Sequence, residues 1–129
     1  MTEPTAARPS AAPLPPGDAN RMIATFEKLL ASGKDTALLR FGLGNEFLKG
    51  ARAADAIPHL RRAVELDPAY SAAWKLLGKA LAGTGAAADA LAAYQQGIDA
   101  AAAHGDQQAV KEMTVFARRI ERQQGGGGK

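Results

Sequence analysis

The sequence predicts an all-α fold made of paired antiparallel helices, and two observations carry this prediction. Two motifs recur at one common offset, the repeat length: Ala-Ala-Asp-Ala at 53–56 and 87–90, and Leu-Gly at 43–44 and 77–78. A repeat length of about 34 residues is typical of helix-turn-helix arrays, in which one unit cannot bury its apolar face alone and stacks on a neighbour. Apolar residues also follow helical spacing from residue 18 onward, and no segment has the pattern of a strand.

The first helix is predicted over residues 20–31. Its apolar residues form one stripe: Met22, Ile23, Phe26, Leu29 and Leu30. Asp18 or Asn20 is the expected cap, because a short polar side chain can accept a hydrogen bond from the first free amides of a helix. The Ser-Gly-Lys segment at 32–34 is expected to end the helix.

The first repeat unit contains two predicted helices, at about 35–49 and 52–66. Residue 35 or 36 supplies the first cap, and Gly50 breaks the chain between the helices. The second helix closes before Pro68, because the residue before a proline avoids the α region. Pro58 falls inside that helix, so we expect its hydrogen-bonded part to start late or to bend there.

The second unit repeats this layout, and one further helix follows it. The three predicted helices span about 71–82, 87–102 and 107–123. Ser71 and Asp106 are the expected caps of the first and the last of them, and the Gly-Thr-Gly segment at 83–85 forms a turn. The total is six helices.

Composition restricts the class of function. The chain of 129 residues has no cysteine, only 5% aromatic residues and a net charge of +3, which favours acidic partners without indicating a nucleic-acid-binding protein. It has no apolar run long enough to span a membrane and no secretory pattern, so we expect a cytoplasmic protein. Residues 1–17 hold five prolines and are expected to form a disordered, Pro/Ala-rich tail.

With residues 37 and 71 as first positions, the two units resemble the tetratricopeptide repeat. The first unit has Arg40, Leu43, Gly44, Phe47, Ala56, Leu60, Ala63 and Pro68 at the positions that mark this family. The second has Trp74, Leu77, Gly78, Leu81, Ala90, Tyr94, Gly97 and Ala102. The small residues let two helices approach closely, and the larger ones fill the space around them. Arg40 departs from the family's aromatic residue, consistent with a contact that the helix at 20–31 covers differently. Ala102 departs from its terminal proline, which would let that helix run on by about a turn.

The resemblance implies helix pairs stacked as a short right-handed superhelix. Two units are fewer than a stable stack needs, so the flanking helices are expected to complete it. The expected organisation is a tail at 1–17, an N-terminal flanking helix at 18–36, repeats at 37–70 and 71–104, a C-terminal capping helix at 105–124 and a flexible glycine tail at 125–129.

In this family the first helices of successive units line a concave groove that holds a peptide or helix of a partner protein. The usual groove positions correspond here to Leu38, Phe41, Asn45, Leu48, Ala72, Lys75, Lys79 and Ala82. Lys75 and Lys79 are a like-charged pair at a spacing of one helical turn, which is unfavourable in an isolated helix. We expect them either to receive an acidic side chain or terminal carboxylate of a partner, or to be two solvated lysines. Asn45 would bond the ligand backbone, and Phe41 would give an apolar seat.

The resemblance therefore implies a non-enzymatic protein–protein interaction scaffold with an unknown protein or peptide partner, which could be acidic. Self-association into a homo-oligomer is the first alternative, and weak binding of RNA or an anionic surface is the second. The three arginines at 118, 119 and 122 are expected in the last turns of the final helix, where cations complement the helix dipole. No cofactor, metal site or catalytic residue is expected, since His59 and His104 are not equivalent and no phosphate-loop, nucleophile-elbow or zinc-protease motif occurs.

Overall fold

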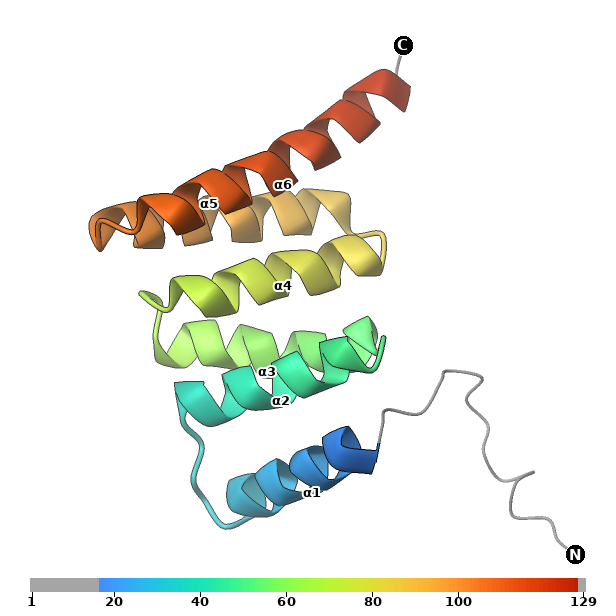
Figure 1. Cartoon of the computed structure of the whole chain (residues 1–129), viewed down its shortest axis with the longest axis vertical. Coiled ribbons are helices and arrows are strands. Elements are labelled where there is room, and N and C mark those ends of the chain that lie inside the picture. Colours follow the sequence, from blue (N-terminus) through green and yellow to red (C-terminus); the bar gives the residue numbers. More distant parts are fainter. Residues whose placement is uncertain (1–16, 128–129) are drawn as a thin grey trace, which may run out of the picture.

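A computed structural model describes residues 17–127, and these residues form six helices without a strand. The helices are α1 (Gly17–Ala31), α2 (Ala37–Lys49), α3 (Ala53–Leu66), α4 (Ser71–Gly83), α5 (Ala87–Ala103) and α6 (Gln107–Gly127). They are stacked along the long axis of the molecule, and α3 and α5 lie behind α2, α4 and α6 in Figure 1. Each helix packs on the next one in the chain, and α4 also contacts α2 and α6. The predicted all-α stack of paired helices is confirmed.

The two repeat units match helix by helix. A shift by one repeat length moves the bounds of α2 onto those of α4, and it moves 53–66 (α3) onto 87–100 within α5. The helix α5 continues to Ala103, as expected from an alanine at 102 where the first unit has Pro68. The repeat in the sequence is therefore a repeat in the structure.

The helix pairs cross where the repeated glycines lie. Leu43 and Leu60 are fully buried in the first pair, and Tyr94 is 2% exposed in the second. A Cβ atom added to Gly78 would lie 2.6 Å from Cε1 of Tyr94, and one added to Gly44 would collide with the side chain of Leu60. Burial raises the pKa of Tyr94 to about 12, as expected for a phenol enclosed in this contact. Glycine is thus required by the close approach of the two helices.

The helix α1 corresponds to the second helix of a further unit. Phe26 lies one repeat length before Leu60, and its ring packs against Gly42 of α2. Met22 and Leu29 correspond in the same way to two alanines of α3, at positions 56 and 63. The exposed fractions are 42% for Met22 and 38% for Leu29, against 0% for both alanines. The first helix that would cover them in a complete unit is not among the described residues.

Two of the expected caps are confirmed. The Thr36 side chain accepts a hydrogen bond from the amide of Leu39 at 3.1 Å, and Asp106 Oδ1 accepts one from the amide of Ala109 at 3.1 Å. The expectation for Ser71 is wrong, because Ser71 is already the first helical residue of α4 and the residue before it occupies the cap position. The expectations for residues 18 and 20 are also wrong, because α1 already begins at Gly17.

Of the two alternatives for Pro58, the late start is wrong and the bend stays a prediction, and the expected end of α6 near residue 123 is also wrong. The helix α3 does not start late, since the amide of Ala56 donates to the carbonyl of Arg52 at 3.1 Å, well before Pro58. Pro58 and Ala54 are both exposed, so the carbonyl that the proline leaves without a donor is accessible to water. The helix α6 runs on to Gly127 instead of ending near residue 123, although glycine is a poor helix former. The three arginines at 118–122 therefore precede its last turn. Of the expected tails at 1–17 and 125–129, residues 1–16 and 128–129 lie outside the described residues, whereas Gly17 and residues 125–127 are helical.

Candidate functional site

The eight groove residues predicted from the sequence all lie outside the buried core. Leu38, Lys79 and Ala82 are exposed, and Leu38 is 71% exposed. The other five are half-buried: Phe41, Asn45, Leu48, Ala72 and Lys75. They belong to α2 and α4, which are in contact, so the first helices of both units present a common face.

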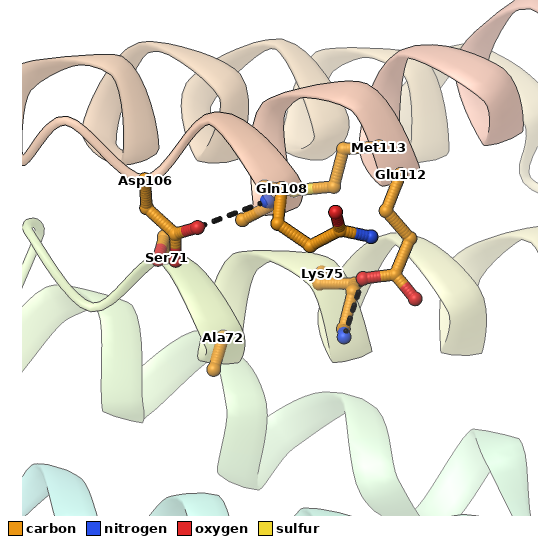
Figure 2. Close-up of a pocket in the computed structure, with 8 residues that line it drawn as sticks. Ser71, Ala72, Lys75, Asp106, Gln108, Glu112 and Met113 are labelled. Carbon is orange, nitrogen blue, oxygen red and sulfur yellow. Dashed lines mark hydrogen bonds and ion pairs between the residues drawn. The ribbon is translucent and has the colours of Figure 1, made fainter.

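This face continues onto α6, where a half-open cavity of about 190 Å³ lies between α4 and α6. The cavity is lined by Ser71, Ala72, Lys75, Asp106, Gln108, Ala109, Glu112 and Met113. Figure 2 shows that α4 supplies one wall and α6 the other. Of the eight predicted residues, Ala72 and Lys75 line this cavity.

An ion pair lies at one end of the cavity. Lys75 Nζ donates to Glu112 Oε1 at 3.0 Å, and the exposed side-chain fractions are 29% and 41%. The pair joins α4 to α6, as Figure 2 shows. Lys79, one turn further along α4, is exposed and has no carboxylate within 4.0 Å in the described part of the chain. The described chain thus supplies a counter-charge to one of the two lysines.

The remaining polar groups of the face differ in how they are used. Asp106 is held at the start of α6 by its bond to the amide of Ala109. Ser71 and Gln108 line the cavity, and neither side chain has a hydrogen-bond partner within the described chain. The side chain of Gln108 extends across the cavity toward the ion pair in Figure 2. These two side chains are therefore available to bond a ligand.

The α2 side of the face is more apolar. The ring of Phe41 stacks on Tyr70, with ring centroids 4.9 Å apart and an angle of 30° between the planes. The side-chain amide of Asn45, one turn further along α2, has no hydrogen-bond partner among residues 17–127. One face of Phe41 is thus already covered by the chain itself, and the expected apolar seat is a pair of aromatic rings.

The residues that α6 contributes were missed by the sequence analysis, although one further shift by the repeat length would have found three of them. This shift moves groove positions 72, 75 and 79 onto Asp106, Ala109 and Met113, which all line the cavity. The sequence did not indicate a third unit because most of the positions that mark the family hold polar residues in α6. There Gln108, Lys111, Glu112 and Val115 take the places of Trp74, Leu77, Gly78 and Leu81.

These changed positions form the outer face of α6. Together with Phe116 they line an open hollow of about 360 Å³. Val115 is 54% exposed there, and Lys111 is exposed. Glu112 lines both this hollow and the cavity at α4. It therefore lies on the boundary between the groove and the end of the stack.

A second charged cluster joins the first unit to the segment just before it. Arg40 donates to Asp35 at 2.7 Å and contacts His59 Nδ1 at 3.1 Å, and Arg62 donates to Asp35 at 3.1 Å. Hydrogen bonds from Arg40 and Arg62 outweigh desolvation and lower the pKa of Asp35 to about 2. Burial and the charge of Arg40 lower the pKa of His59, whose ring stacks on Phe47. Arg40 thus takes part in an ion network with Asp35 and His59 in place of the family's aromatic contact.

Comparison with known proteins settles the family. A curated protein of Pseudomonas aeruginosa, described as a TPR repeat-containing protein, is 56% identical over 101 residues, covering 78% of this chain and 96% of that protein. The chain belongs to the tetratricopeptide repeat family. The model of the bacterial transcriptional activator domain, which is tetratricopeptide-like, matches residues 17–120.

Solved structures agree with the assignment to the tetratricopeptide repeat family. The solution structure of a Bordetella parapertussis protein is 48% identical with a TM-score of 0.68, and the match covers 78% of this chain and 88% of that one. The crystal structure of a tetratricopeptide repeat domain protein from Salinibacter ruber is 30% identical with a TM-score of 0.61, covering 66% of this chain and 94% of that one.

The described residues offer neither a membrane span nor a metal site. No helix between 17 and 127 is long and apolar enough to cross a membrane. Over the same range, histidine and carboxylate side chains do not gather in groups of three that could hold a metal ion.

Proposed function

We propose that this tetratricopeptide repeat protein is an interaction scaffold that binds a segment of a partner protein in the groove formed by α2, α4 and α6. The observation that carries the proposal is the common face of these helices, which leaves all eight predicted groove residues outside the core and ends in the cavity beside Lys75. A concave surface with a few unpaired polar groups is the usual form of a binding site. The matched family model is named for a domain of transcriptional activators, and we propose for this chain only the binding of a protein segment.

Charge reversal with a matched control tests this proposal. Lys75→Glu with Lys79→Glu changes two cations, one helical turn apart, on the groove. Arg118→Glu with Arg122→Glu makes the same change at the same spacing on α6, at exposed positions outside the cavity. Each tagged protein is used to capture partners from a lysate of the source organism, and recovery is compared by quantitative mass spectrometry.

The recovery of partners captured by the wild-type chain should fall at least about tenfold in the Lys75/Lys79 variant, as the loss of about 1.4 kcal/mol of binding free energy would produce. Their recovery by the arginine variant should equal that by the wild type. Circular dichroism should show the same helicity for all three proteins. Equal losses in both variants would indicate a response to net charge alone, and unchanged capture by the lysine variant would refute the groove.

Self-association is a second candidate, favoured by the uncovered stripe on α1. Met22 and Leu29 expose apolar surface where the equivalent alanines of α3 are buried, and two such stripes could cover each other around a two-fold axis. Sedimentation velocity over a hundredfold range of concentration tests this candidate. A monomer at every concentration rejects it, and a dimer that is lost in Met22→Ser/Leu29→Ser supports it.

A further inference from the structure

We propose that the partner segment carries a carboxylate that takes the place of Glu112 on Lys75, so that Glu112 acts as a built-in competitor within the groove. This inference rests on the proposed groove function and names the chemistry of the ligand at its α4–α6 end. It concerns one lysine and one glutamate, in contact at 3.0 Å on the edge of the cavity.

The first step concerns the two lysines of α4, of which only one is paired with a carboxylate. Lys75 and Lys79 repel each other across one helical turn, and the described chain places a carboxylate only beside Lys75. Glu112 reaches Lys75 alone, so a ligand carboxylate on this face would supply the counter-charge that Lys79 lacks in the described chain. The lysine end of the face therefore favours an anion over a neutral group once Glu112 has left Lys75.

The second step is the ease with which Glu112 can leave. Its side chain is 41% exposed and that of Lys75 is 29% exposed, so water can take over the hydrogen bonds of Glu112. Glu112 also borders the open hollow on the outer face of α6, which gives its carboxylate a solvated position to occupy. Breaking the pair thus costs little, whereas a fully buried pair would hold.

The third step is the presence of further ligand-binding groups within reach. Ser71 and Gln108 line the same cavity, and neither has a hydrogen-bond partner within the described chain. Asp106, at the far end in Figure 2, is fixed by its bond to the Ala109 amide and adds a negative charge away from the ion pair. The cavity thus accepts an anion at the Lys75 end and donors of a peptide backbone at the Asp106 end.

Glu112→Gln tests the inference, with Glu121→Gln as the control. Both variants remove one negative charge from α6, but Glu121 is exposed and does not line the cavity. The probes are two acetylated octapeptides of the same apolar sequence, one ending in Leu-Glu-Glu with a free carboxylate and the other in Leu-Gln-Gln with a terminal amide. Binding is followed by the amide chemical shifts of α2, α4 and α6 in NMR titrations up to millimolar peptide.

The expected result is that the acidic peptide binds about 1.5- to 5-fold more tightly to Glu112→Gln than to the wild type, the range set by the loss of a partly exposed ion pair. Glu121→Gln should bind it as the wild type does, and Lys75→Gln should lose the preference for the acidic peptide. Equal gains in both glutamate variants, or no gain in Glu112→Gln, overturns the inference. So does the failure of the acidic peptide to bind any variant.

The outcomes for the two proposals can be told apart. If the amide peptide binds the groove as tightly as the acidic one in every variant, the groove function stands and the role of Glu112 is refuted. If the lysine variant of the capture experiment retains its partners, the groove function fails independently of the peptide result.

Discussion

Replacing Gly78 with alanine should destabilise the protein, although alanine is the better helix former. The added Cβ would lie 2.6 Å from Cε1 and 2.7 Å from Cδ1 and Cζ of Tyr94. The ring cannot withdraw easily, since Tyr94 is 2% exposed and packs against Phe116 with centroids 5.7 Å apart. Overpacking of this kind costs about 1–3 kcal/mol, and the gain in helix propensity returns about 0.5–1 kcal/mol. At the middle of these ranges, we expect the free energy of unfolding to fall by about 1 kcal/mol.

Urea and thermal unfolding followed by circular dichroism measure this change. For a chain of this size each kcal/mol corresponds to a change in Tm of about 4 °C, so Gly78→Ala should lower the Tm by about 4 °C. Gly83→Ala is the control in the same helix, since its Cβ would meet Ala53 Cβ at an ordinary 3.5 Å. Its stability should be unchanged or slightly raised. A Gly78→Ala protein as stable as the wild type would refute the argument that the helix crossing requires glycine.

Two further predictions concern the backbone and pH. Ala51 has a φ of 60°, and its repeat equivalent Gly85 has a φ of 83°, a backbone conformation that favours glycine. Ala51→Gly should therefore raise the free energy of unfolding by about 1 kcal/mol, and Gly85→Ala should lower it by a similar amount. Urea unfolding measures both changes, and variants as stable as the wild type would contradict this reasoning. The pKa of His59 is lowered from 6.5 in the folded chain, so the unfolded chain binds the proton first as pH falls. The stability that His59 contributes should therefore be complete above pH 6.5 and be lost between that pH and its folded pKa, and His59→Gln should flatten this part of the pH profile.

The fold was predictable because its determinants are local or repeat along the chain. The Leu43-Gly44 pair and its copy mark the helix crossings directly, and the breaks at Gly50 and Pro68 separate the helices. Helix ends were predicted less well, because a cap depends on which residue the chain places just before the first turn. Ser71 has the right chemistry for a cap, but the helix has already begun when it is reached.

The candidate site was predictable only on its α2 and α4 side. Lys75 and Glu112 are 37 residues apart, and their contact depends on how α6 docks on α4 and α5. The repeat pattern reaches α6, but polar residues occupy most of its core positions, so the residues that mark the family are absent there. The contact between Lys75 and Glu112 therefore follows only from the three-dimensional position of α6.

Glu112 also determines what can happen at the end of the stack. It occupies the third place in the series that begins with Gly44 and Gly78, at which a following helix would cross α6. A helix nesting there would have to take the carboxylate out of water and would meet a long side chain in place of a bare backbone. Addition of a further copy by helix nesting at this end is therefore disfavoured.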